Sequence, residues 1–327
     1  MKDIDRVVRH LQEKHGTGTQ RDDSIFERGM MANSLAKPRA EYPLIATPPR
    51  QLKIEMTNIC NQRCVYCPNR DMRRAKGFID AELVRSVVRE AKELAINEIG
   101  FYTTGESLLH PQLPELIRYA KEQGIPYTFL DTNGALLTPD RAAALMDAGL
   151  DSLKYSCSAG TRETYRAIHG CDDFDRVLEH MRATHALRAA RGGRKPHLAI
   201  SYIVSRDNEA EIPRLRESAG PYVDEMLFLP MNNIGGQVPA GAKEKQLHEF
   251  TEFETAYAPC QYLWSKAIVT WEGRLTICPV DFENQLVYGD LHEETLAAAW
   301  NNARMQEFRR RIRDNELDGL ICKRCLF

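Results

Sequence analysis

The sequence predicts an α/β fold, with a parallel sheet that closes partly or wholly into a barrel and a small module after it. The barrel is predicted because six extended stretches alternate with helical ones between residues 52 and 230. The module is predicted because this alternation stops near Gly235 and Gly236, after which a second group of cysteines follows. We therefore divide the 327 residues into an N-terminal helix and linker (1–50), a strand–helix domain (51–236) and a C-terminal module (237–327).

The elements of the barrel follow from the spacing of apolar residues and from signals at helix ends. After Asp80, apolar residues recur at helical spacing, and a second helix is expected at residues 113–123 with Gly124 as its C-terminal cap. Thr138 predicts the start of the next helix, which Gly149 ends. The chemistry of such folds lies at the C-terminal ends of the strands. The expected strands are residues 52–56, 98–103, 127–132, 152–156, 198–204 and 225–230.

The segments outside the barrel have weaker patterns. Apolar residues on one face predict a short amphipathic helix within residues 1–16. The polar, proline-containing stretch 16–50 is expected to be a wrapping segment or linker. In the C-terminal module, Glu272 and Gly273 predict a hairpin turn, and an arginine-rich helix is expected at about residues 296–313.

The composition and charge exclude several classes of partner. Lys and Arg total 44 against 46 for Asp and Glu, so the net charge of −2 gives no general attraction for nucleic acid or an anionic membrane. No apolar run approaches the roughly 18 residues of a membrane span, and the N-terminus lacks the apolar stretch of a secretory signal. We expect a cytoplasmic protein whose nine cysteines are ligands or free thiols rather than disulfides.

Three cysteines form a C-x3-C-x2-C pattern just past the first expected strand, namely Cys60, Cys64 and Cys67. Three thiolates at this spacing hold three irons of a [4Fe–4S] cluster, and the fourth iron is left without a protein ligand. The alternative is zinc, which closely spaced cysteines also bind. A structural zinc site takes four ligands, however, and no fourth Cys or His follows nearby. The pattern therefore favours the cluster.

This pattern, in this position, resembles the radical S-adenosylmethionine (SAM) superfamily, in which SAM chelates the open iron through its amino and carboxylate groups. The resemblance covers most of the chain and implies a partial (β/α)6 barrel of the TIM type. It also implies that electron transfer into SAM yields a 5′-deoxyadenosyl radical. Tyr66 matches the aromatic residue that packs on the adenine in this family. Because the cofactors carry the chemistry, no catalytic residue is assigned beyond the cluster ligands.

Further SAM contacts are implied by the same resemblance at the ends of the second and fourth strands. Thr104, Gly105 and Glu106 match the family's Gly-Gly-Glu motif, which binds the methionyl amino group, with Thr in place of the first Gly. The carboxylate of Glu106 suits an ammonium group. Ser156 and Ser158 resemble residues that contact the ribose and carboxylate of SAM. The alternatives are structural, since Glu106 would also cap the following turn and the serines would satisfy buried backbone groups.

The second cysteine group offers four thiolates: 17 residues separate Cys260 from Cys278, and a C-x2-C pair follows at Cys322 and Cys325. With Gly273 between them, this order resembles the SPASM and twitch extensions of radical SAM enzymes. Four cysteines imply one auxiliary [4Fe–4S] cluster in which every iron has a protein ligand, as in the twitch type. The alternative is a four-cysteine zinc ribbon, whose cysteine pairs have shorter spacings.

Other polar residues near the expected site receive structural roles or weak contacts. Cys157 is expected to be a packed thiol, with hydrogen-atom donation as the alternative. His169 is expected to be structural or solvated. Asn232, Asn233 and the pair Gly235-Gly236 follow the sixth strand and are candidates for polar substrate contacts.

The presence of two clusters limits the type of reaction but does not identify the substrate. The radical would remove a hydrogen atom from an unactivated carbon, and the auxiliary cluster would accept the remaining electron. Radical SAM dehydrogenases of cyclitols and amino sugars resemble this chain in having one auxiliary cluster. We therefore favour oxidation of a small polyhydroxylated, amino-sugar or cyclitol substrate, with flavodoxin or ferredoxin as a typical electron donor. The alternatives are modification of a peptide or protein side chain, sugar epimerisation and a non-catalytic electron carrier.

Overall fold

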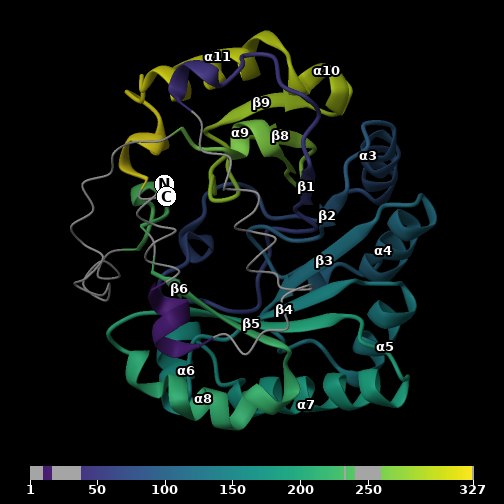
Figure 1. Cartoon of the computed structure of the whole chain (residues 1–327), viewed down its shortest axis with the longest axis vertical. Helices are drawn as coiled ribbons and strands as arrows, with labels where there is room; N and C mark the ends of the chain where they lie inside the picture. The colour runs from purple at the N-terminus through teal and green to yellow at the C-terminus, as the bar shows by residue number, and fades with distance from the viewer. Residues whose placement is uncertain (1–9, 17–37, 232, 240–258, 326–327) are drawn as a thin grey trace.

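The fold is that of a computed structural model, which describes residues 10–16, 38–231, 233–239 and 259–325. The strands of this part are β1 (Gln51–Ile54), β2 (Glu98–Gly100), β3 (Tyr127–Thr132), β4 (Ser152–Ser156), β5 (His197–Val204), β6 (Glu225–Pro230), β7 (Lys266–Val269), β8 (Arg274–Thr276) and β9 (Val287–Asp290). They form one curved sheet in the order β6-β5-β4-β3-β2-β1-β7-β8-β9 (Figure 1). Every pairing from β6 to β7 is parallel, and the last two are antiparallel.

Helices separate the parallel strands and cover the outer face of the sheet (Figure 1). They are α3 (Ala81–Glu93), α4 (Leu113–Glu122), α5 (Pro139–Asp147), α6 (Arg162–His169), α7 (Phe174–Ala190) and α8 (Ile212–Ala219), followed in the C-terminal module by α9 (Tyr262–Ser265), α10 (Leu296–Trp300) and α11 (Ala303–Asp314). Since β1 to β6 are parallel and alternate with helices, the predicted partial (β/α)6 barrel is confirmed. Among the described helices, none is long and apolar enough to cross a membrane.

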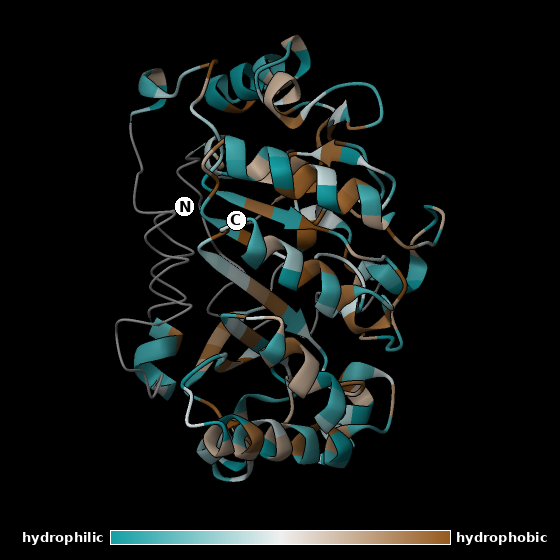
Figure 2. Cartoon of the chain, turned by 90° about the vertical axis from the view of Figure 1, so that its right-hand side faces the viewer, coloured by the Kyte–Doolittle hydropathy of each residue, from teal (hydrophilic) through white to brown (hydrophobic). Residues whose placement is uncertain are grey.

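The two faces of each strand have different partners. On β1, Leu52 and Ile54 are fully buried in the hydrophobic core, whereas Gln51 and Lys53 are only partly buried. Successive side chains of a strand point to opposite faces, so Gln51 and Lys53 point into the barrel interior. The helices supply the other half of the core from their apolar faces, and Figure 2 shows hydrophilic and hydrophobic segments alternating along them.

Local signals at helix ends behave as predicted. The side chains of Asp80 and Thr138 each accept a hydrogen bond from the backbone N–H three residues later, at 2.9 and 3.4 Å. Gly124 and Gly149 follow the second and third helices with φ of 82° and 83°. This left-handed conformation favours glycine, so both helix ends are set by local chemistry.

The C-terminal module continues the barrel sheet. Strand β7 pairs in parallel with β1, and β7 and β8 form the hairpin that was predicted around Glu272 and Gly273. Gly273 has φ of 79°, as the tight turn requires. The sheet therefore runs through the expected boundary between the two parts, and the division of the chain by residue number stays a prediction.

The single helix expected at residues 296–313 is wrong, because α10 and α11 are two helices separated by Asn301 and Asn302. The Asn302 side chain accepts the Met305 N–H at 2.9 Å and so caps a new helix. Asn301 exchanges two hydrogen bonds of 2.9 Å with the backbone of Ala46. Asparagine side chains compete with the helical backbone for hydrogen bonds, and here their hydrogen bonds interrupt the helix.

The N-terminal residues partly match expectation. Residues 10–15 are helical, and the remainder of the helix expected at 1–16 lies outside the described residues. Within the expected wrapping segment, residues 38–50 lie along the C-terminal module. Trp264 Nε1 donates to the Pro43 carbonyl and Trp300 Nε1 to the Thr47 carbonyl, both at 2.7 Å. This part of the segment therefore wraps as predicted.

Replacing Asp151 with Asn is expected to lower the free energy of unfolding by about 2 kcal/mol at pH 7. Its buried carboxylate accepts hydrogen bonds from Lys121 Nζ (2.7 Å), Lys195 Nζ (2.5 Å) and Thr128 N (2.9 Å). Burial raises the pKa of Asp151, but the lysine hydrogen bonds outweigh it and the net pKa is lowered. Stabilisation from a lowered pKa is complete above the unfolded pKa of about 3.9 and lost as pH falls below it.

The check is urea unfolding of native and variant chains at pH 7 and at about pH 3.5. The stability difference is expected to shrink at the lower pH. Asp147→Asn serves as the control, because Asp147 pairs with Arg191 on the surface (2.7 Å) and such pairs contribute about 0–1 kcal/mol. An equal Asp151→Asn difference at both pH values would contradict the assigned ionisation.

Candidate active site

The loop after β1 brings Cys60, Cys64 and Cys67 together. The charges of Cys60 and Cys67 act on Cys64, that of Cys67 also acts on Cys60, and a 3.1 Å backbone hydrogen bond closes a turn from Cys67 N to Cys64 O. Burial raises the pKa of Cys60 to about 11 and raises the pKa values of Cys64 and Cys67 as well. Thiols that resist ionisation by themselves are stabilised as thiolates when a metal binds them.

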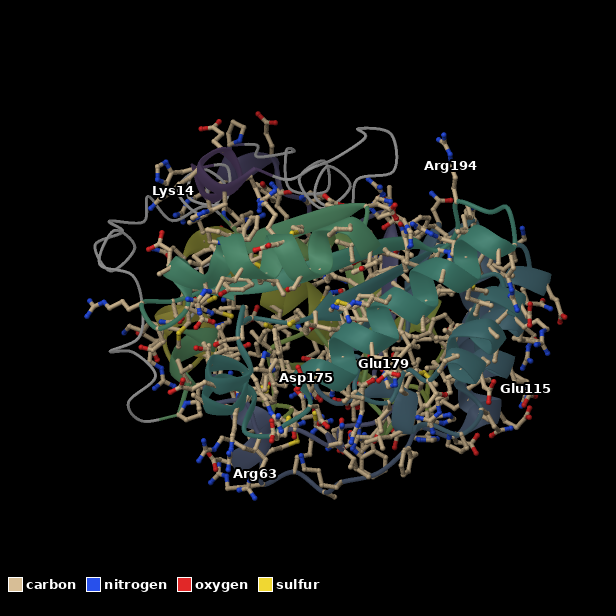
Figure 3. All side chains as sticks on the ribbon, turned by 90° about the horizontal axis from the view of Figure 1, so that it is seen from below. Lys14, Arg63, Glu115, Asp175, Glu179 and Arg194 are labelled. Atoms are coloured by element: carbon tan, nitrogen blue, oxygen red, sulfur yellow. The ribbon has the colours of Figure 1, made fainter. Side chains whose placement is uncertain are left out.

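The same loop is fastened to the end of α6. The N–H groups of Arg63 and Val65 donate to the carbonyls of His169 and Ile168 at 3.1 and 2.8 Å. Gly170 follows with φ of 70°, and a Cβ at this position would lie 2.8 Å from the Arg63 carbonyl oxygen. The position therefore needs glycine on two grounds. The Arg63 side chain points outward at the edge of the molecule (Figure 3).

His169 has a more specific place than the expected structural or solvated role. It is 1% exposed and stacks on Tyr165, and its Nε2 accepts the Ser158 N–H at 3.1 Å. Burial lowers the pKa of His169 to about 3, so the ring is neutral and its proton lies on Nδ1. Nδ1 faces Gln62 Oε1 at 3.2 Å and Cys64 Sγ at 3.4 Å. Nothing in the local sequence marks this histidine, because the contact depends on α6 packing against the loop.

The donor set fits a SAM-binding [4Fe–4S] cluster. Three soft thiolates come from one loop, and the N–H of His169 is available to a thiolate at Cys64. In the described part of the chain, no three His, Cys, Asp or Glu side chains converge closely enough for a single metal ion. Three thiols leave the fourth ligand position of a structural zinc unfilled and suit a cluster that is held by three cysteines.

A second loop, after β2, packs directly beneath the cysteine loop. Gly105 lies so close to it that a Cβ would be 2.3 Å from the Thr57 carbonyl oxygen and 2.6 Å from that of Ile59. The Asn69 side chain also ties the loops together, because its Nδ2 donates to the Thr104 carbonyl at 2.7 Å. Gly105 is therefore required by close approach of two backbones, which is a steric role distinct from turn formation.

Glu106 is 2% exposed and holds three hydrogen bonds. Its Oε1 accepts from Thr132 Oγ1 (2.8 Å) and Leu108 N (3.0 Å), and its Oε2 accepts from Asn133 N (2.8 Å). The turn-capping alternative is thus present in the structure, since Leu108 lies in the short 3-10 turn Ser107–Leu109. A carboxylate offers about four acceptor positions, so one remains on Oε2 for a ligand ammonium. Burial raises the pKa of Glu106.

Thr104 turns its hydroxyl toward Glu55, a residue that the sequence analysis did not single out. Glu55 accepts two hydrogen bonds from Arg74 Nη2 at 2.7 and 2.9 Å and one from Trp271 N at 3.0 Å. Arg74 also pairs with Glu272 at 2.6 Å. This buried network joins the loops after β1 and β2 to the hairpin of the C-terminal module. The one feature of the local sequence that could have pointed to this network is the position of Glu55 at the end of the first expected strand.

The structure brings Tyr66 and Ser158 together, and their roles in binding SAM stay a prediction. The Tyr66 hydroxyl donates to Ser158 Oγ at 3.2 Å, and the Ile203 N–H donates to the same oxygen at 3.0 Å. Ser156 is partly buried at the end of β4, on the face opposite Tyr155. Cys157 is fully buried in the hydrophobic core, so the expected packed thiol is confirmed.

The four C-terminal cysteines lie near one another. Cys260 precedes α9, Cys278 follows β8, and Cys322 and Cys325 lie on the last described turn. The charges of Cys260, Cys322 and Cys325 all act on Cys278. Burial raises the pKa of Cys260 to about 11 and that of Cys322 to about 12. Four partly buried thiols without another ligand type fit an iron–sulfur cluster as well as zinc by donor chemistry alone.

The candidate substrate contacts after β6 instead support this second site. Asn233 Nδ2 donates to the Arg324 carbonyl at 2.6 Å, between Cys322 and Cys325. Gly235 and Gly236 approach the same turn, with φ of 61° and 78°. Asn232 lies outside the described residues. Asn233, Gly235 and Gly236 therefore help to position Cys322 and Cys325.

These features define a class of protein: an α/β barrel enzyme with an open three-thiol cluster site and a closed four-thiol site. The chain matches the Radical SAM superfamily over residues 54–219 and the SPASM iron–sulfur cluster-binding domain over residues 260–326. It therefore belongs to the radical SAM superfamily and carries a C-terminal SPASM domain. Its cofactors are SAM, the SAM-binding [4Fe–4S] cluster and an auxiliary iron–sulfur cluster.

Curated relatives share about half to two thirds of their length with this chain. A probable GTP 3′,8-cyclase of Saccharolobus islandicus (strain M.14.25 / Kamchatka #1) is 31% identical over 207 residues, which are 63% of this chain and 65% of the relative. That of Metallosphaera sedula is 30% identical over 191 residues, 58% of this chain and 57% of the relative. The alignments thus span less than two thirds of these proteins.

Solved structures share the fold at lower sequence identity. BtrN in complex with AdoMet and 2-DOIA has a TM-score of 0.58 at 20% identity, covering 86% of this chain and 95% of BtrN. Streptococcus suis SuiB bound to precursor peptide SuiA has a TM-score of 0.66 at 15% identity, covering 86% and 70%. Native anSMEcpe with bound AdoMet has a TM-score of 0.57 at 17% identity, covering 80% and 82%. These likenesses establish the fold alone.

Proposed function

We propose that this radical SAM enzyme is an oxidoreductase that dehydrogenates a small polyhydroxylated substrate, of the cyclitol or amino-sugar type, inside its barrel. When bound, the cofactors supply a 5′-deoxyadenosyl radical that takes a hydrogen atom and an auxiliary [4Fe–4S] cluster that takes one electron. A C–H bond thus loses two electrons, one with the hydrogen atom and one to the acceptor, and a proton is released.

The observation that carries this proposal is the parallel pairing of β1 with β7. Strand β1 leads to Cys60 and strand β7 follows Cys260, so neighbouring strands connect to the two thiol sites. The charge of Cys278 also acts on Lys53, which points into the barrel. An electron acceptor bordering the substrate space is what a dehydrogenase of this type needs.

Residues of the chain would position SAM at the open end of the barrel. We assign the remaining acceptor position of Glu106 to the methionyl ammonium and the joined pair Tyr66 and Ser158 to the adenosyl part. Thr104 and Gly105 would line the same loop, and Ser156 would contact the ribose or carboxylate. The many bonds already fixing Glu106 and Ser158 support this, because groups held in place lose little entropy on binding.

The curated relatives and one of the solved structures favour a small substrate over a peptide. The curated relatives are named for GTP, and BtrN was solved with 2-DOIA. Modification of a peptide remains the second candidate, because SuiB and anSMEcpe were each solved with a bound peptide. Epimerisation would need a hydrogen-atom donor, and Cys157 is enclosed by the core rather than by the barrel interior.

A reducing cytoplasm and an electron donor such as flavodoxin or ferredoxin belong to the same proposal. No two of the nine cysteines are joined in a disulfide, which suits a reducing compartment.

The test compares anaerobically reconstituted native protein with a Cys322→Ala/Cys325→Ala variant on cyclitols, amino sugars and peptides. Native protein should release 5′-deoxyadenosine and form an oxidised small molecule in about equal amounts. The variant should keep about four irons and 5′-deoxyadenosine release but lose the oxidised product. Mass spectrometry reads both products. If the variant still formed the oxidised product, the auxiliary cluster would not be the electron acceptor. If only peptides were turned over, peptide modification would replace dehydrogenation as the proposed function.

A further inference from the structure

The barrel interior contains an uncommon group of three lysines, of which one is buried and two are partly buried. Lys53 of β1, Lys154 of β4 and Lys266 of β7 each alternate with residues that pack into the core on the helix side of the sheet. Because alternate side chains point to opposite faces, all three lysines point into the barrel. Lys266 is 8% exposed, and lysine is among the residues least often fully buried without a partner.

One of the three charges is balanced. Lys154 Nζ lies 3.0 Å from the carboxylate of Asp131 on β3. The Tyr102 hydroxyl also hydrogen-bonds to Asp131. The charge of Asp131 also acts on Lys53, but its ion pair and its hydrogen bond go to Lys154 and Tyr102.

The other two lysines have no carboxylate partner among the described residues. Lys53 Nζ donates to the Tyr102 hydroxyl at 2.9 Å and lies 4.5 Å from the centre of that ring. Lys266 Nζ lies 4.3 Å from the centre of the Tyr262 ring and makes no ion pair within the described part of the chain. The nearby Glu98 is bound by Arg50 at 2.7 Å. Two ammonium groups therefore keep unused donors inside the barrel.

The cost of this arrangement appears in their ionisation. Burial and the charge of Lys266 lower the pKa of Lys53 to about 7. Burial lowers the pKa of Lys266 to about 8, against the opposing effect of Cys260. Neither ammonium group has a carboxylate at ion-pair distance in the described part of the chain, and an anion between them would offset the cost of burying their charge.

The thiolates of the auxiliary site are one source of negative charge, but they do not account for both lysines. Cys260 is the largest neighbouring charge acting on Lys266. On Lys53, however, Cys278 acts more weakly than Lys266, Asp131 or Lys154. Lys53 therefore responds mainly to the barrel interior, where the substrate would lie.

We propose that Lys53 and Lys266 bind an anionic group of the substrate, either a phosphate or a carboxylate, inside the barrel. This rests on the proposed function, in which a small molecule reacts there. It narrows the substrate class to sugars or cyclitols that carry such a group, because a purely cationic amino sugar would meet two ammonium groups that have no direct ion-pair partner among the described residues. Oxyanions and lysine ammonium groups form strong charge-assisted hydrogen bonds.

The test is calorimetric titration of the reconstituted, SAM-loaded enzyme with four related probes: glucose 6-phosphate, gluconate, glucose and glucosamine. We expect one or both anions to bind and the neutral and cationic probes not to bind. Preference between the two anions distinguishes phosphate from carboxylate. A Lys53→Gln/Lys266→Gln variant should bind the anion at least tenfold more weakly. Lys195→Gln, on a lysine whose side chain is 71% exposed, should bind it as the native enzyme does.

Iron content and thermal unfolding of each variant show whether it is loaded and folded. Equal binding of all four probes, no binding of either anion, or unchanged anion binding by the double variant would overturn the proposal. The proposal would also be overturned if the double variant lost iron from the auxiliary cluster but kept its affinity for the anion. Binding is measured without turnover. If the enzyme bound the anion but no oxidation were found, the anion site would be supported and only the proposed dehydrogenase function would be contradicted.

Discussion

Alanine at Cys60, Cys64 and Cys67 together is expected to remove about four of roughly eight irons per chain and to abolish 5′-deoxyadenosine release. The three thiols come from one loop, and no other cysteine of that loop can replace them. Without thiolates the open iron that SAM chelates cannot be held. Iron and sulfide counting after anaerobic reconstitution, together with chromatography of the SAM products, measures both effects.

Cys157→Ala is the matched control for this variant. Cys157 is a cysteine of the same domain that packs in the hydrophobic core, so its loss should lower stability slightly and leave the iron content unchanged. About four irons in the native chain and none in the triple variant would mean that the C-terminal cysteines hold no cluster. The proposed oxidation would then have no electron acceptor.

Gly105→Ala is expected to lower 5′-deoxyadenosine release about a hundredfold, although it adds only one methyl group. The new Cβ would meet two carbonyl oxygens of the cysteine loop at 2.3 and 2.6 Å, which are backbone atoms that cannot move aside cheaply. Relief of the clash displaces either the cysteine loop or Glu106. Overpacking of this kind also costs about 1–3 kcal/mol of stability. Initial rates of SAM cleavage and the unfolding midpoint measure the two effects.

Gly220→Ala is the control for this change. Gly220 has helical φ and ψ of −50° and −42°, and a Cβ there would meet the Arg216 side chain at an ordinary 3.7 Å. This substitution should leave SAM cleavage unchanged, although it should lower stability, because a residue with a Cβ is disfavoured in the helical conformation directly before Pro221. Native activity in Gly105→Ala would show that the loops separate freely and that their close packing is not needed.

Features that depend on a few neighbouring residues were predictable from the sequence. The strands β1 to β6 follow from runs of apolar residues, and the helix ends follow from Asp80, Thr138, Gly124 and Gly149. The cysteine spacing likewise predicts which side chains gather at each site. These signals act over one or two turns of chain, within the range at which sequence patterns decide local conformation.

Features that depend on distant residues were not predictable in the same way. Asn301 interrupts the expected C-terminal helix because it bonds to Ala46, 255 positions away. His169 reaches Cys64 because α6 packs against the cysteine loop, 105 positions away. Such contacts arise from the order of strands in the sheet rather than from spacing along the chain.

The sequence by itself determined the class of enzyme, because iron–sulfur ligation is encoded in short cysteine spacings and the barrel in a repeated pattern. The tertiary structure alone decided how the two thiol sites relate and what the interior offers a substrate. The pairing of β7 with β1 places the auxiliary site beside the barrel, and it brings Lys53 and Lys266 onto neighbouring strands. A charge becomes costly only when burial removes its water, and burial is a property of the folded chain.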